Sequence, residues 1–171
     1  LLENNPPTLL SVATAIPDFR LDQREVASVA LRLFDRERSE IDRLMPVFEN
    51  AGISSRYSCV PFEWYAEPHG WKERSALYLE HATRLLRDAA ERALAQAGRK
   101  PSDIAGIVAV STTGIATPSL DALMINALGL PSDVQRLPVF GLGCAGGVVG
   151  IGHAVNMARQ TEHGEVLFLV V

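Results

Sequence analysis

The sequence predicts a layered α/β fold around a mixed, largely parallel sheet. From Ile104 onward, short apolar runs alternate with stretches whose apolar residues recur at helical spacing. The apolar runs are nearly continuous, as in strands that are buried on both faces. Strands that alternate with helices are usually joined in parallel through helical crossovers. The 171 residues can bury one substantial core, so we expect a single domain over residues 1–171.

The first part of the chain gives the weaker patterns. Residues 9–16 (LLSVATAI) are apolar and precede a proline, so we expect a strand there. Asp22 and Glu25 resemble a capping box at the start of a helix. A second short helix is expected near residues 41–50, interrupted or begun again at its proline. Residues 54–70 mix aromatics, prolines and a histidine without a period, which predicts a loop.

A long helix over residues 72–97 is the clearest element. Gly98 ends it and Pro101 prevents its continuation. Its apolar stripe consists of Ala82, Leu85, Leu86, Ala89, Ala93, Leu94 and Ala97, with Arg84, Arg87, Asp88 and Glu91 away from the stripe. The remaining elements are, in order, a strand at 104–111, a helix begun by Thr117-Pro118 and ended by Gly129, a strand at 135–140, a helix from about Ala145 to Gln160, and a strand at 166–171.

Composition excludes several classes of protein. Charged residues make up 21% and the net charge is −4, which argues against nucleic-acid binding through a general positive field. Residues 137–158 carry no charge over a length that could span a membrane, but their glycines, proline, histidine and asparagine favour a buried strand–turn–helix. The two cysteines, Cys59 and Cys144, form no metal or redox spacing. We therefore expect a cytoplasmic protein without a membrane span.

The ends of the sequence suggest a piece of a longer protein. The chain begins without methionine and shows no secretory signal. Its last residues, EVLFLVV, resemble an unfinished apolar strand, whose unpaired edge would favour aggregation.

Residues 139–152 (VFGLGCAGGVVGIG) match two motifs. Gly141, Gly143 and Gly146 have the G-x-G-x-x-G spacing of a dinucleotide site. That site needs an acidic residue about 20 positions on, at the end of the next strand. Glu165 has the distance, but it precedes the expected strand. The dinucleotide interpretation is therefore the weaker one.

The same stretch places Cys144 where a strand turns into a helix. A helix N-terminus favours the thiolate, and its free N–H groups can hold an oxyanion. Gly143 permits the bend, while Gly146 and Gly147 leave room for a thioester or for close helix packing. A buried structural thiol fits the spacing about equally well. None of the four histidines is positioned by a motif as the base that a nucleophile needs, and a base for Cys144 is missing from these residues.

The run VSTTGIATPSLDALMINALGLPSDVQRLPVFGLGCAGG resembles the type III polyketide synthases, the chalcone and stilbene synthase family, in its bacterial branch. The similarity extends from the start of the chain through ISSRY at residues 53–57 to the last strand, as the N-terminal half of a family subunit. The resemblance implies a thiolase-like fold and a homodimer. It also implies that Cys144 accepts an acyl group from acyl-CoA and that malonyl-CoA extends it, without a further cofactor. The family's histidine and asparagine would belong to the other half.

The resemblance also implies four substrate-binding residues. Thr112 and Thr113 match a small polar pair that lines the cavity, although turn formation before Pro118 explains them equally well. Thr117 matches a residue that the family's loop passes across the dimer interface. Arg43 matches a basic residue that contacts the phosphates of CoA. Pro46 and Asn50 stand where plant members have basic residues, and Arg56 is a possible substitute.

Four functions follow from these patterns. The first is a type III polyketide synthase, whose GLGCAGG form is similar to bacterial enzymes that take long-chain starters to alkylpyrones or alkylresorcinols. The second is a CoA-primed ketoacyl-carrier-protein synthase. The third is a non-catalytic binding or dimerisation module with Cys144 buried, and the fourth is a dinucleotide-dependent oxidoreductase.

Overall fold

The computed structural model describes residues 6–33, 43 and 45–171. They fall into two compact units. The larger consists of residues 71–171 with the N-terminal segment up to Ala15, and the smaller of residues 16–70. Across the described residues, no helix is long and apolar enough to span a membrane.

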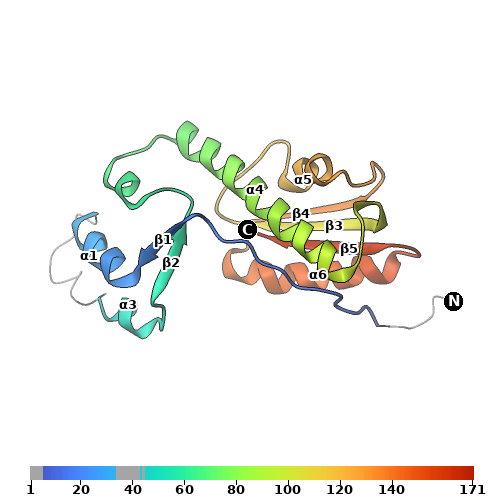
Figure 1. Cartoon of the computed structure of the whole chain (residues 1–171), viewed down its shortest axis with the longest axis horizontal. Coiled ribbons are helices and arrows are strands. Elements are labelled where there is room, and N and C mark those ends of the chain that lie inside the picture. Colours follow the sequence, from blue (N-terminus) through green and yellow to red (C-terminus); the bar gives the residue numbers. More distant parts are fainter. Residues whose placement is uncertain (1–5, 34–42, 44) are drawn as a thin grey trace. The chain divides into compact units, whose positions relative to one another are not determined.

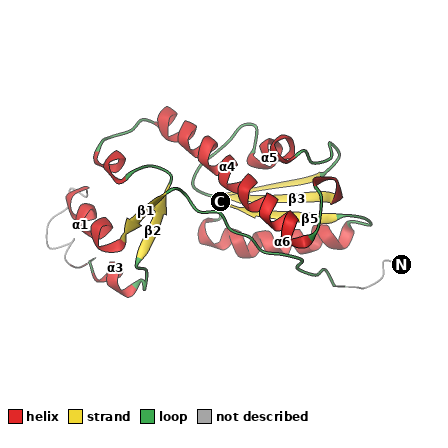
Figure 2. Cartoon of the chain, viewed as in Figure 1, coloured by secondary structure: helices red, strands yellow, loops and turns green. Residues whose placement is uncertain are grey.

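The larger unit contains a parallel three-stranded sheet. Strand β3 (Ile104–Ser111) lies between β4 (Gln135–Phe140) and β5 (Glu165–Val170), as Figure 2 shows. Ser111 is in register with Phe140 of β4, and Val110 is in register with Val170 of β5. The predicted strands at 104–111 and 135–140 are confirmed, and the predicted last strand begins one residue earlier than expected.

Helices cover both faces of this sheet (Figure 1). Helices α4 (Trp71–Ala97) and α5 (Leu120–Leu128) pack on one face, where Ile107 and Ala109 of β3 belong to their core cluster. Helix α6 (Gly146–Gln160) packs on the other face, where Val110 lies against its glycines. Successive side chains of β3 therefore point to opposite layers, as strand geometry requires. The predicted layered arrangement is confirmed.

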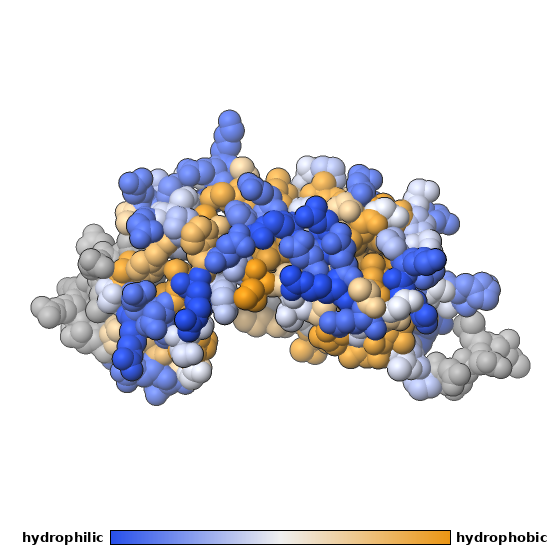
Figure 3. Space-filling view, viewed as in Figure 1, coloured by the Kyte–Doolittle hydropathy of each residue, from blue (hydrophilic) through white to orange (hydrophobic). Residues whose placement is uncertain are grey.

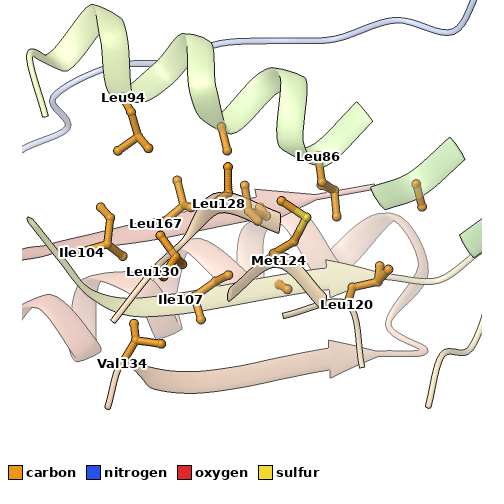
Figure 4. Packing of buried hydrophobic residues seen from close by; sticks show 14 residues of the cluster. Leu86, Leu94, Ile104, Ile107, Leu120, Met124, Leu128, Leu130, Val134 and Leu167 are labelled. Carbon is orange, nitrogen blue, oxygen red and sulfur yellow. The ribbon is translucent and has the colours of Figure 1, made fainter. Parts of the chain in front are cut away.

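The core lies between α4, α5 and the sheet. In Figure 4, Leu86 and Leu94 of α4 point towards Met124 of α5 and Leu167 of β5. The predicted stripe on α4 gives the correct face, and Ala90, which lies outside the predicted stripe, is buried there as well. Figure 3 shows hydrophilic side chains over the outer side of α4. Helix α4 ends where Gly98 takes a φ of +64°, as its sequence predicts.

The expected strand at residues 9–16 is wrong, because the structure has no strand there. The segment is instead held to α4 by single hydrogen bonds. Ser11 Oγ donates to the Ala93 carbonyl oxygen at 2.8 Å, and the Arg92 guanidinium donates to the Thr14 carbonyl oxygen at 2.9 Å. Apolar composition does not create a strand when no neighbouring strand pairs with its backbone.

In its described residues, the smaller unit has two short strands, two α-helices and a 3₁₀ helix. Strands β1 (Phe19–Asp22) and β2 (Ser55–Ser58) pair in antiparallel. Helix α1 (Gln23–Leu33) begins as predicted, since Asp22 Oδ1 accepts the Arg24 N–H at 2.8 Å. Helix α3 (Pro46–Asn50) confirms the second part of the second predicted helix, and residues 41, 42 and 44 lie outside the described residues.

The loop expected at residues 54–70 is wrong in part, because it contains β2 and the 3₁₀ helix η1 (Phe62–Ala66). Strand β2 reads SRYS, which has too few apolar residues to alternate between two faces. Its partner in β1 lies more than 30 residues away, so no local pattern could indicate the pairing.

Candidate active site

Cys144 lies in a tight turn between the sheet and α6. Two glycines make the turn possible, since Gly141 has a φ of +83° and Gly143 a φ of +56°. Residues that carry a side chain rarely adopt such positive φ values. Cys144 follows in the 3₁₀ helix η3 (Gly143–Ala145), and its thiol is free and exposed. The alternative in which Cys144 is buried is wrong for this structure.

Helix α6 begins directly behind the cysteine. Ala145 is its N-cap residue and makes no side-chain capping bond, so the first N–H groups of the helix have no side-chain acceptor. Gly146 lies against Val110, where a β-carbon would clash, whereas a β-carbon on Gly147 would meet nothing within 4 Å. Of the two roles predicted for these glycines, close packing applies to Gly146, and open space surrounds Gly147.

A second connection leaves the same edge of the sheet beside Cys144. Ser111 ends β3 and Phe140 ends β4, and the two residues are in register in parallel strands. Adjacent strands lie about 5 Å apart. Thr112 and Thr113 follow Ser111 and are exposed. The structure therefore brings the predicted threonine pair to the edge that carries Cys144, which is where open α/β sheets bind ligands.

A small cavity of about 80 Å³ lies beneath this connection, between the ends of β3 and β4 and the start of α5. Tyr78 of α4 shares a hydrogen bond of 2.6 Å with Ser111 Oγ. Burial raises the pKa of the Tyr78 hydroxyl, and the hydrogen bond from Ser111 lowers it by less. Tyr78 therefore keeps its proton well above neutral pH.

The far end of the connection is held by an ion pair. Asp121 is fully buried, and its Oδ2 accepts the Arg136 Nε–H at 2.7 Å, while Arg136 also donates to Ser119 Oγ at 3.1 Å. The second carboxylate oxygen of Asp121 is buried without a partner. Residues 111–121 are thus fixed at both ends by side chains from other elements.

The other predicted substrate-binding residues are exposed as well. Thr117 lies in the same connection, before a cis peptide bond to Pro118. Helix α5 begins at Leu120, two residues after that proline, so the helix predicted from Thr117-Pro118 starts later than expected. Arg43 is exposed in the smaller unit. Arg56 donates to Gln23 Oε1 at 2.7 Å.

The histidines of the larger unit lie on three different elements. His163 lies in the turn before β5, at the opposite edge of the sheet from the cysteine. His81 is half-buried in the middle of α4, and His153 is exposed nine residues further along the chain from Cys144. Glu165 opens β5 and is bonded to Arg99 at 2.8 Å, so the carboxylate required for a dinucleotide lies at the wrong edge of the sheet.

Helix α6, which contains most of the uncharged run at residues 137–158, has one side packed on the sheet and one exposed apolar side. One side packs on the sheet through Gly146 and Gly150. The other side leaves Val148 77% and Ile151 54% exposed, and Figure 3 shows a hydrophobic patch along the edge of the unit where α6 runs.

Residues 2–171 match the family described as chalcone and stilbene synthases, N-terminal domain. The chain belongs to this family. It is 32% identical to a putative chalcone synthase of Bacillus subtilis (strain 168) over 166 residues, which are 94% of this chain and 46% of that protein. It is 34% identical to the 1,3,6,8-tetrahydroxynaphthalene synthase of Streptomyces peucetius subsp. caesius, over 85% of this chain and 38% of that enzyme.

The fold agrees with this membership. The crystal structure of 1,3,6,8-tetrahydroxynaphthalene synthase from Streptomyces coelicolor A3(2), a bacterial type III polyketide synthase, superposes with a TM-score of 0.85 at 26% identity. The superposition covers 94% of this chain and 47% of that one. The predicted thiolase-like N-terminal half is confirmed. The chain spans less than half the length of these relatives.

Two residues that support the edge around Cys144, Tyr78 and Asp121, were not among the predicted site residues. Tyr78 falls on the buried side of α4, where its hydroxyl needs a polar partner. Asp121 is a lone charge in an apolar helix, which also calls for a partner. These two signals were present, but the partners, Ser111 and Arg136, depend on how the layers pack.

Proposed function

We propose that the natural protein is a type III polyketide synthase, in which Cys144 takes an acyl group from acyl-CoA and malonyl-CoA extends it. The exposed position of Cys144, at a glycine turn ahead of a helix N-terminus that has no side-chain cap, carries this proposal. Family membership supports it. A dinucleotide-dependent oxidoreductase would need a carboxylate at this edge, and Glu165 lies at the opposite one. A ketoacyl-carrier-protein synthase would belong to a different family from the one that this chain matches.

The chemistry requires a nucleophile and a stabilised oxyanion. The Cys144 thiolate attacks the thioester carbon of the starter, and the tetrahedral intermediate expels the CoA thiolate. Backbone N–H groups at the start of α6 are suited to stabilise the oxyanion. Malonyl-CoA then loses CO₂, and its C2 carbanion attacks the acyl carbon on Cys144. The product is a ketoacyl-CoA that is two carbons longer, and the thiolate is regenerated.

The remaining assignments belong to the same proposal. Thr112 and Thr113 line the acyl site, Thr117 contributes across a homodimer interface, and Arg43 contacts the phosphates of CoA. Residues 1–171 act as one N-terminal domain of a cytoplasmic enzyme, whose histidine and asparagine come from outside the matched residues. Membership of the family supports these assignments, and the exposure of all four side chains permits them.

Mass spectrometry of acylated peptides tests the proposal. The protein in its natural length is incubated with long-chain, short-chain, aromatic or malonyl-CoA thioesters and then digested. We expect an acyl adduct on the Cys144 peptide that is absent in Cys144→Ala and retained in Cys59→Ala, the matched control. Product analysis with malonyl-CoA, with and without a carrier protein, separates the synthase from its carrier-dependent rival. If no thioester of the panel labels Cys144 while iodoacetamide does, the thiol is accessible but is not an acyl acceptor, and the proposal fails.

A further inference from the structure

Tyr78 contacts both ends of the turn that carries Thr112 and Thr113. Its hydroxyl hydrogen-bonds Ser111 Oγ at 2.6 Å, immediately before the threonines. Its ring lies over Gly114, immediately after them, so closely that a β-carbon on Gly114 would clash with three ring atoms. One side chain of α4 therefore fixes the backbone on either side of two exposed residues.

This contact comes from a rigid part of the fold. Tyr78 packs against the core cluster, four residues before the buried Ala82 on α4. Ser111 is 7% exposed and ends the central strand β3, so its side chain has little freedom. Burial raises the pKa of the Tyr78 hydroxyl. The hydroxyl therefore keeps its proton at neutral pH, and the hydrogen bond to Ser111 is retained.

We propose that Tyr78 is a positioning residue for the acyl-acceptor site around Cys144. It acts through the turn at residues 111–114 and sets the place of Thr112 and Thr113 beside the cysteine. This inference rests on the proposed function and adds a residue from α4, a helix that carries none of the predicted site residues. The hydrogen bond between Tyr78 and Ser111 fixes the backbone before the two threonines, and the contact of the Tyr78 ring with Gly114 fixes the backbone after them.

The chain offers a matched control for this bond. Tyr65 and Ser58 also share a hydroxyl–hydroxyl hydrogen bond, of 2.8 Å, in the smaller unit. Tyr65→Phe removes the same chemical group as Tyr78→Phe, but from residues to which no part of the acylation chemistry is assigned. Any loss that follows simply from one missing, partly buried hydroxyl–hydroxyl hydrogen bond appears in both variants.

The experiment measures two rates at Cys144 in the protein in its natural length. Acylation by a saturating acyl-CoA from the panel above reports substrate positioning, and alkylation by iodoacetamide reports the access to the thiol and its thiolate fraction. We expect Tyr78→Phe to slow acylation roughly two- to tenfold, the effect of one lost hydrogen bond, with alkylation unchanged. Ser111→Ala should give the same loss, and the double variant no further loss, because both remove one interaction. Tyr65→Phe should leave both rates unchanged.

Each other outcome contradicts the inference in a distinct way. If Tyr78→Phe acylates at the wild-type rate, or if Tyr65→Phe slows acylation as much, Tyr78 has only a structural role. Equal slowing of acylation and alkylation would show a general change around the thiol and also overturns the inference. If the wild type itself forms no acyl adduct, the proposed function fails, and this inference fails with it.

Discussion

Replacing Arg136 by methionine tests how much the ion pair between Arg136 and the buried Asp121 contributes to the free energy of unfolding. The structure supplies a close comparison, because Arg99 pairs with Glu165 at 2.8 Å and Arg136 with Asp121 at 2.7 Å. The two arginine side chains are 42% and 43% exposed. The carboxylates differ, since that of Glu165 is 33% exposed and that of Asp121 is fully buried. The pair of substitutions therefore differs chiefly in the burial of the acceptor, with Arg136→Met also removing the exposed hydrogen bond to Ser119 Oγ.

The expected costs differ because only one carboxylate can return to water. Exposed ion pairs contribute about 0.2–1 kcal/mol, so Arg99→Met should lower the free energy of unfolding by less than about 1 kcal/mol. Breaking a fully buried pair costs about 3–5 kcal/mol. Arg136 is partly exposed, which reduces the interaction that is lost, and we expect Arg136→Met to cost about 2–3 kcal/mol.

Urea unfolding of both variants, with m-values equal to that of the wild type, measures these costs. Asp121→Asn in the Arg136→Met background removes the unpaired charge and should recover part of the loss. Added salt should reduce the cost of Arg99→Met further and leave that of Arg136→Met nearly unchanged, since buried pairs are poorly screened. Equal costs for the two single variants would refute the assigned role of Asp121 burial.

Two further predictions concern α6 and Tyr78. Gly150→Ala places a β-carbon against Phe168 and Val110 and should lower the free energy of unfolding by up to about 2 kcal/mol, because overpacking outweighs the gain in helix propensity. Gly152→Ala adds a β-carbon in open space and should raise the free energy of unfolding by about 1 kcal/mol. Effects of the same sign in urea unfolding would contradict the packing of α6. Because burial raises the Tyr78 pKa, its neutral form stabilises the fold below about pH 10, and this stabilisation is lost as the pH rises through the folded-state pKa. The difference in unfolding free energy between wild type and Tyr78→Phe should therefore narrow from pH 8 to the alkaline range, and a difference that stays constant would show that Tyr78 is not buried as described.

The sequence predicts the larger unit well because its signals are local. The apolar stripe of α4 determines which side of the helix is buried, and Gly98 and Gly129 mark two helix ends through left-handed backbone values. The apolar strands at 104–111 and 135–140 are bounded by turn residues, so their limits are predicted as well. These elements need no information about distant parts of the chain.

The failures lie where pairing decides the structure. Residues 9–16 have the composition of a strand but no ladder partner in this structure. Residues 19–22 and 55–58 have little strand character, yet Arg20 pairs with Tyr57 across a long separation in sequence. A single sequence does not contain the register of such distant segments, and a four-residue strand is too short to show a period.

The candidate site divides in the same way. The glycines around Cys144 predict the turn from local backbone needs, and the order of parallel strands places Thr112 near it. The bonds from Tyr78 to Ser111 and from Arg136 to Asp121 depend on the rotation of helices against the sheet, which no pattern in the sequence states.

The register of β3 unites these observations, because its last two residues support the site from opposite faces. Val110 lies under Gly146 and Gly150 and so sets the start of the helix behind Cys144. Ser111 points to the other layer and holds Tyr78. A slip of β3 by one residue would turn the Ser111 side chain to the face that α6 covers and the Val110 side chain to the face that α4 covers. The turn at Cys144 and the turn at Thr112 would then lose their supports together. The chemistry proposed for this edge of the sheet therefore depends on the same strand register that buries Ile107 in the core.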